Sequence, residues 1–449
     1  MLITRKSIFA VLIALFVVAG FGIASAAQVG GLASNSGVAL PVGLNNFVNP
    51  AGVGDTLIYN YYNARNGYQT FFTVVNTDSA NGIRARVRLR EAADVAKNGV
   101  CTPEEPRGSF EILDFDLCLS ANDVWTGYIT IDSTTGAAKL CSIDTDTLIQ
   151  DGITPGHVFP SNCVLTKFGS NGLANGNITA DDTLEGYIEV IGERTIAADP
   201  LTCGNPGVTS GTNRDQDTNV GDATNSLFGN VAIASLAPAG ATFTYDATAI
   251  GDFAAGDIAN GVQTSQPDLT SGSNGLVGVN FILSKNMLYS IYDLDNARSE
   301  SIVTIPTKAL TQQCGPNNDI FDDDRVTLQF FDDKEHPTTG SGCAYSPCLP
   351  SQEDHLPFEV NAILPRVGNS IMTAGTDSIE VLPLIQTPYN FGWYFVDLNR
   401  AGTTPIHATT FGIPGTTSFG WPTLGITLLD INSGVSTGVF QMQYMTDVH

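Results

Sequence analysis

The feature that most constrains the fold is a ten-residue segment in which four arginines stand at every second position from 84 to 90. From Ile83 to Ala92 the sequence reads IRARVRLREA, so apolar residues and arginines alternate along it. A period of two is the signature of a β-strand whose two faces meet different surroundings. The segment therefore predicts a strand with one apolar face and one cationic face.

A second alternating segment supplies the complementary charge. From Glu111 to Ser120 the sequence reads EILDFDLCLS, with leucines and phenylalanine on one face and aspartates on the other. If the two strands pair, apolar residues meet on one face and arginines meet aspartates on the other. Opposite charges facing each other across two strands contribute roughly 0.2–1 kcal/mol per pair. We interpret this charge ladder as sheet architecture rather than a reaction centre; its members are Arg86, Arg88, Asp114 and Asp116.

The rest of the chain repeats short alternating segments between turn residues, and strong amphipathic helices are missing. Many short strands with Gly and Pro between them are typical of β-sandwiches. We therefore predict an all-β fold: an antiparallel β-sandwich built as two packed sandwich domains, with long loops pinned by disulfides. Among the expected strands are Thr70–Thr77, Asp123–Ile131 and Leu184–Glu193, and a hairpin formed by Asn230–Pro238 and Thr242–Ile250.

The expected domain boundary falls in a long segment without apolar periodicity. Residues 198–225 are rich in Gly, Asn, Asp and Thr, the composition of a linker or long loop. The predicted organisation is a signal peptide (1–26), an N-terminal β-sandwich domain (27–197), a linker or loop (198–229) and a C-terminal β-sandwich domain (230–449).

The first residues predict export. Arg5 and Lys6 precede an apolar run from Ile8 to Ile23, and Ala24-Ser25-Ala26 has the small-x-small form of a cleavage site. This is the pattern of a secretory signal peptide, with an uncleaved membrane anchor as the alternative. No later segment has the roughly 20 continuous apolar residues that a spanning helix needs. We expect an exported protein at the cell surface, outside the cell or in the periplasm.

The formal charge of −25 restricts the partners. Such a field repels nucleic acids and anionic membranes, so a nucleic-acid partner is not expected. The same field favours solubility and attracts cations.

The cysteine count is even, as in disulfide-bonded exported proteins. Pairing between neighbours in the sequence is expected for Cys101 with Cys118, for Cys141 with Cys163, and for Cys314 with Cys343 or Cys348. Cys203 would take the partner that is left. Metal ligation is the alternative, but no CxxC pair or nearby histidine supports it. The disulfide candidates are Cys101, Cys118, Cys141, Cys163, Cys203, Cys314, Cys343 and Cys348.

Two acidic segments are candidates for structural calcium, the only cofactor that the sequence suggests. Crowded carboxylates suit Ca²⁺, which takes 6–8 oxygen ligands. One set flanks an expected strand and comprises Asp319, Asp322, Asp323, Asp324, Asp332 and Asp333. The other alternates along a loop and comprises Asn213, Asp215, Asp217 and Asn219. The second set is not an EF-hand, because Val220 replaces the expected glycine. Solvated acidic loops are the alternative for both.

Catalytic signatures are missing from the sequence. It contains no HExxH, HxH or GxSxG motif. A glycosidase needs only two suitably spaced carboxylates, which a sequence cannot exclude. The three tryptophans, Trp125, Trp393 and Trp421, could form a sugar platform or pack in a core.

Several of these segments together resemble a family of exported bacterial proteins assigned to the cell surface. The resemblance rests on TVVNTDSANGIRARVRLREA, EILDFDLCLSANDVWTGYI, LEGYIEVI, TIPTK and PFEVNAI, and covers most of the chain after residue 26. It implies an envelope or extracellular location and a β-rich fold, and it transfers no catalytic residue.

Three functional hypotheses follow. The first is a non-enzymatic exported structural protein, a surface-layer-like or matrix subunit whose main partner is itself. The second is an adhesin or carbohydrate-binding protein whose partner is a cell-surface glycan. The third is a secreted hydrolase.

Overall fold

The protein is described from a computed structural model, and nearly all of its regular structure is β-strand. The described residues are 47–92, 111–144, 146–150, 157–166, 168, 178–197, 225–235, 242–252, 283, 286–294, 297–306, 325–332, 351–356, 359–364, 371, 380–383, 391–398, 408–410, 417–419 and 423–431. The predicted all-β fold of antiparallel sheets packed face to face is confirmed. No helix within these ranges is long and apolar enough to cross a membrane.

The arginine strand lies near the middle of the first sheet, which we call sheet A. This strand is β4 (Gly82–Glu91), and all of its residues are buried. Its neighbours are β5 (Glu111–Leu119) on one side and β11 (Glu185–Ile196) on the other. The sheet order is β1 (Phe47–Val48), β15 (Thr248–Gly251), β2 (Thr56–Asn63), β11, β4, β5, β8 (Leu148–Gln150) and β9 (His157–Val158).

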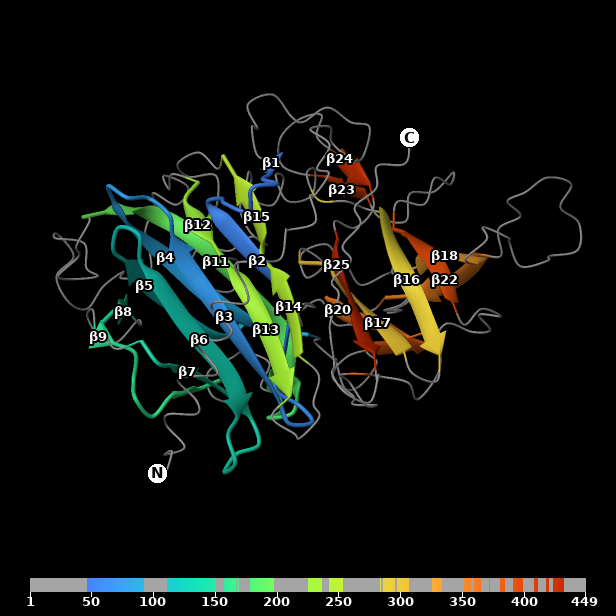
Figure 1. Cartoon of the computed structure of the whole chain (residues 1–449), viewed down its shortest axis with the longest axis horizontal. Coiled ribbons are helices and arrows are strands. Elements are labelled where there is room, and N and C mark those ends of the chain that lie inside the picture. The colour runs from blue at the N-terminus through green and yellow to red at the C-terminus, as the bar shows by residue number, and fades with distance from the viewer. Residues whose placement is uncertain are drawn as a thin grey trace, which may run out of the picture.

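Sheet B packs on the apolar face of sheet A. It is also antiparallel, with order β10 (Val164–Leu165), β7 (Ala138–Ser142), β6 (Val124–Ile131), β3 (Tyr68–Asn76), β13 (Asn230–Ser235) and β14 (Thr242–Asp246), while β12 (Leu227–Phe228) pairs with β3. Trp125 lies at the centre of the core, with its ring 5.5 Å from Phe72 of sheet B and 5.7 Å from Phe115 of sheet A. Figure 1 shows these strands together in blue to yellow-green.

One expected hairpin strand is divided between the two sheets. β13 and β14 pair as predicted, with Ala232 opposite Thr244. The strand expected to run on to Ile250 breaks at Ala247, whose N–H donates to the Gly229 carbonyl. After this break β15 pairs with β2 in sheet A, with Ala249 opposite Leu57. The chain therefore joins the two layers at this corner.

A third sheet lies beyond sheet A and has two halves. The β16 half contains β19 (Ser351–His355), β18 (Arg325–Asp332), β22 (Phe391–Asp397) and β16 (Asn286–Leu294). The β17 half contains β25 (Leu424–Ile431), β17 (Ala297–Thr304), β20 (Val360–Leu364) and β21 (Glu380–Pro383), with β20 and β21 parallel. Among the described residues, the strand register that joins the halves consists of the pairs Asp293–Arg298 and Leu294–Ala297. A separate pair is formed by β23 (Ala408–Thr410) and β24 (Thr417–Phe419).

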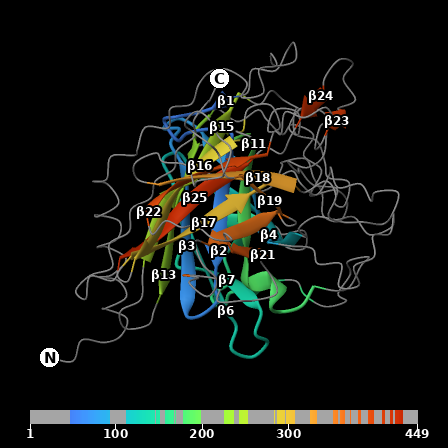
Figure 2. The same ribbon diagram turned by 90° about the vertical axis from the view of Figure 1, so that its right-hand side faces the viewer.

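The β17 half packs against sheet A. Ile302, Val360 and Ile426 belong to the same apolar core as the residues between sheets A and B. Thr304 Oγ1 donates to the Asn60 carbonyl at 2.5 Å, and Val360 N–H donates to the Ala92 carbonyl at 3.1 Å. Figure 2 looks onto this side, where β17 and β25 cross in front of sheet A. The opposite face of the β17 half forms a second core with the β16 half.

The strand pairing disagrees with the expected boundary at residue 230. β13, β14 and β15 fall in the expected C-terminal domain, yet β13 pairs with β3, β14 extends sheet B beyond β13, and β15 pairs with β2. A change in composition along the sequence does not show which distant strands a segment will pair with, because that pairing is decided only in the folded chain. The rest of the expected linker, up to residue 224, lies outside the described residues. Two sandwich domains remain a prediction.

Candidate functional site

The largest cluster of ionisable side chains in the described residues lies along β4. Arg84, Arg86, Arg88 and Arg90 are each at most 3% exposed. β4 and β5 pair in the register expected from the alternation, with Arg86 opposite Asp116 and Arg88 opposite Asp114. The apolar residues pair on the other face, as Val87 does with Phe115. The cationic face is thus enclosed in the protein.

The carboxylates of β5 contact the arginines from one side. Asp116 is 1% exposed and bridges Arg84 and Arg86, lying 2.6 Å from Arg86 Nη1. Asp114 also pairs with Arg86. Glu111, at the start of β5, lies 2.5 Å from Arg88 Nε. β5 therefore supplies acids to three successive arginines.

β11 supplies carboxylates from the other side. Glu193 lies 2.7 Å from Arg84 Nε, and Glu189 lies 3.2 Å from Arg90 Nε and 3.8 Å from Arg88 Nη1. Both glutamates are at most 2% exposed. They extend the ladder to three strands, a buried charge layer centred on β4. Their spacing in LEGYIEVIGE, with acids at positions 185, 189 and 193, is a signal that could have identified them.

The charge layer lies on the face of sheet A that meets the third sheet. Tyr187 is opposite Arg90 in the register, so the two side chains share a face. The Tyr187 hydroxyl donates to the Pro306 carbonyl at 3.3 Å, directly after β17. The arginines are therefore desolvated, and each needs its carboxylates more than a surface arginine would.

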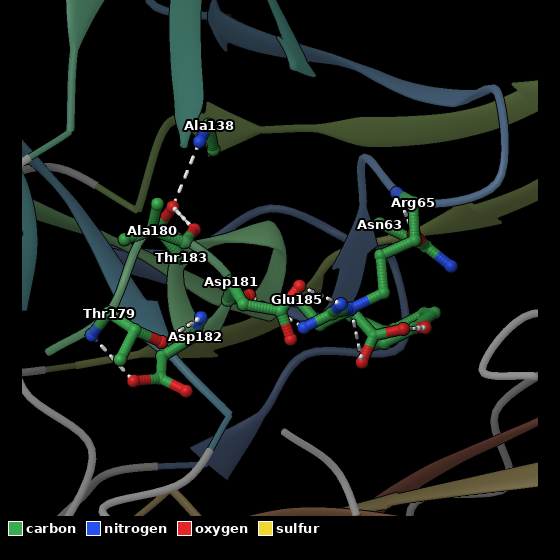
Figure 3. Close-up of polar contacts among 10 residues, drawn as sticks. Asn63, Arg65, Ala138, Thr179, Ala180, Asp181, Asp182, Thr183 and Glu185 are labelled. Carbon is green, nitrogen blue, oxygen red and sulfur yellow. Dashed lines mark hydrogen bonds and ion pairs between the residues drawn. The ribbon is translucent and has the colours of Figure 1, made fainter. Parts of the chain in front are cut away.

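A second charged cluster lies at the end of β2 and is drawn in Figure 3. Arg65 Nη1 donates to Asp181 Oδ1 at 2.6 Å, and Arg65 Nε lies 3.4 Å from Glu185 Oε2. Glu185 is fully buried, and it also accepts a hydrogen bond from the Tyr61 hydroxyl at 3.2 Å. Asp181 is more than half exposed, so this cluster reaches from the interior to solvent.

A short 3₁₀ turn holds Asp181 in place. The turn is η1 (Asp182–Leu184). Thr179 N–H donates to Asp182 Oδ2 at 2.7 Å, and Thr183 Oγ1 accepts from Ala138 N–H at 2.8 Å (Figure 3). The second bond ties the turn to β7 of sheet B, so Arg65 connects both sheets.

The electrostatics favour permanently charged arginines. Burial lowers the pKa of Arg86, but Asp116, Glu111 and Glu193 together raise that pKa above its ordinary value. Burial likewise lowers the pKa of Arg65, and Asp181 and Glu185 more than offset that effect. A guanidinium held in this way neither gives up nor accepts a proton near neutral pH. The arrangement keeps the positive charges of Arg86 and Arg65 fixed beside their carboxylates.

Six buried tyrosines have raised pKa values. Burial is the largest cause of the raised pKa in each of them, and the charges of Glu185 and Glu300 add to it for Tyr61. These buried tyrosines are Tyr59, Tyr61, Tyr62, Tyr245, Tyr289 and Tyr394.

One of the expected disulfides is present. Cys141 and Cys163 are bonded and join the end of β7 to the residue before β10. Cys118 is also disulfide-bonded, and its partner lies outside the described residues. The other candidates, Cys101, Cys203, Cys314, Cys343 and Cys348, lie outside them as well.

The calcium candidates are almost all outside the described residues. Asp332 ends β18, whereas Asp319, Asp322, Asp323, Asp324, Asp333, Asn213, Asp215, Asp217 and Asn219 fall in ranges that are not described. Within the described ranges, no group of three or more His, Cys, Asp or Glu side chains is placed to hold a metal ion. Calcium binding remains a prediction.

The tryptophan at the centre of the core cannot take part in a sugar platform. Trp125 is fully buried between sheets A and B. Trp393 in β22 is half-buried, and Trp421 lies outside the described residues.

Comparison with known proteins adds no family to this description. No family model, no curated protein and no solved structure matches the chain. The resemblance to exported cell-surface proteins therefore stays a prediction.

Proposed function

We propose that the chain is a non-enzymatic structural protein of the cell surface or extracellular space, a surface-layer-like or matrix subunit. The observation that carries the proposal is the buried charge layer. The most concentrated set of acids and bases in the described structure is engaged in ion pairs between neighbouring strands of sheet A. Charged side chains that are buried and paired in this way have fixed positions. This arrangement suits a protein whose role is to keep its shape.

Two further features support an exported structural role. The Cys141–Cys163 bond is of the kind that persists in oxidising compartments. The sequence begins with the pattern of a signal peptide, which would direct the chain out of the cytoplasm. Sheets with ion pairs and a disulfide between their own strands, stacked on an apolar core, suit a subunit that must keep its form outside the cell.

The decisive experiment is electron microscopy of cells with and without the gene for this chain. We expect a surface or matrix density that disappears with the gene and returns on complementation. Purified mature protein should assemble in calcium and lose assembly in a chelator if structural calcium contributes. An unchanged cell surface would overturn the proposal. Turnover of polysaccharides or esters by the purified chain would replace it with a secreted hydrolase.

A further inference from the structure

The outward face of sheet B differs in character from the rest of this acidic protein. Among the outward residues of β3, β6, β7, β13 and β14, only Lys139 and Asp246 are charged. The whole chain carries 45 acidic and 20 basic residues. An outward sheet face with a single carboxylate is therefore much less acidic than the chain as a whole. We call these outward residues the neutral face.

Apolar side chains gather on the neutral face and at its margin. Phe71 and Tyr128 are opposite each other on β3 and β6, and their rings stack at 5.5 Å. Val124 lies in the same strand and is 50% exposed. Ile143, just past β7, and Leu165 of β10 are also exposed. Of the exposed large hydrophobic residues in the described ranges, only Val158 belongs to sheet A.

Several polar side chains of this face bind each other. Gln69 Nε2 donates to Thr130 Oγ1 at 2.8 Å, and Thr73 Oγ1 donates to Asn230 Oδ1 at 3.0 Å. Lys139 pairs with Asp132 at 3.1 Å. A sugar site presents polar groups aimed at the ligand, whereas these groups are engaged along the sheet. The apolar side chains are therefore the main contact that the face offers.

We propose that the neutral face docks against the same face of a second copy of this chain. Two copies that each carry a charge of −25 repel one another, and this repulsion is weakest where both surfaces carry few carboxylates. A symmetric contact places each residue on both sides of the interface, so apolar meets apolar across it. Sheet-on-sheet stacking is how sheets A and B already pack within the chain. The inference rests on the proposed function and names the contact by which subunits associate.

A matched pair of valines tests the proposal. Val124→Glu places a carboxylate on the neutral face, at a side chain that is 50% exposed. Val158→Glu places one on β9 of sheet A, at a side chain that is 44% exposed. Sedimentation equilibrium of the oxidised mature protein across the micromolar range should show a dimer. We expect Val124→Glu to weaken dimerisation by about tenfold or more, because each dimer loses two apolar contacts and gains like charges. Val158→Glu should leave the dimer unchanged. Urea midpoints and circular dichroism would establish that both variants fold, and Val124→Thr gives a milder change at the same site.

Three outcomes would overturn the proposal. The first is a wild-type protein that stays monomeric at every concentration. The second is an equal weakening of association by both glutamate variants. The third is a monomer whose neutral face binds a neutral polysaccharide and loses that binding in Val124→Glu. If the two variants weaken association equally while the surface density still depends on the gene, the neutral face is not the interface between copies. The proposed function would then still stand.

Discussion

Asp116 gives the most direct test of the buried charge layer. Its carboxylate is 1% exposed and contacts both Arg84 and Arg86. The substitution Asp116→Asn keeps the shape and removes the charge. Removing one partner of a buried ion pair costs about 3–5 kcal/mol, because the other charge is left buried. Arg84 retains Glu193 at 2.7 Å and Arg86 retains Asp114, so we expect the lower end of that range, about 3 kcal/mol.

The assay is urea unfolding of the oxidised protein, followed by tryptophan fluorescence and by circular dichroism. Trp125 lies 5.7 Å from Phe115, the neighbour of Asp116 in the sequence, so its emission reports on this part of the core. Coincident transitions would justify a two-state free energy of unfolding. Asp132→Asn is the control for removing a carboxylate from a surface turn, where Asp132 pairs with Lys139 and accepts hydrogen bonds from Thr134 and Thr135, and a smaller loss than at Asp116 is expected.

A small loss would refute the reasoning. An exposed ladder would lose only about 0.2–1 kcal/mol on removal of one charge. A value in that range for Asp116→Asn would mean that water reaches the arginines. A double-mutant cycle with Arg86→Met provides a second check, since residues in direct contact show coupling of about 0.5–3 kcal/mol. Additive effects would contradict the contact.

Three further predictions concern packing, the disulfide and pH. Gly229→Ala would place a Cβ 2.0 Å from the Tyr59 hydroxyl, so we expect a loss of about 1–3 kcal/mol and a lower thermal midpoint. Replacing Cys141 and Cys163 together with serine opens a link of sequence separation 22, and should cost about 3 kcal/mol, measured against the oxidised wild type. The buried tyrosines have raised pKa values in the folded state, so their stabilising contribution is complete below pH 10, the ordinary pKa, and falls as pH rises above it. Absorbance at high pH should therefore show these phenols ionising together with unfolding, and early independent ionisation would contradict their burial.

Sequence reasoning reached furthest where a pattern was local. The positions of β4 and β5, to within a residue, and the meeting of arginine with aspartate on one face followed from alternation and complementary charge, because both signals lie within two neighbouring segments. The Cys141–Cys163 pair was predicted for the same reason, since the partners are close in the chain. The calcium candidates cannot be compared in this way, because all but Asp332 lie outside the described residues.

Only the tertiary structure revealed what surrounds the ladder. β11 follows β5 by many residues and contributes Glu189 and Glu193 from the opposite side of β4. The third sheet then covers this face of sheet A, with Tyr187 reaching the carbonyl of Pro306. Alternation along one strand shows which residues share a face, but it carries no information about the distant segment that packs on that face. The sequence by itself therefore determined that arginine would meet aspartate, and the packing of distant strands decided that they meet away from water.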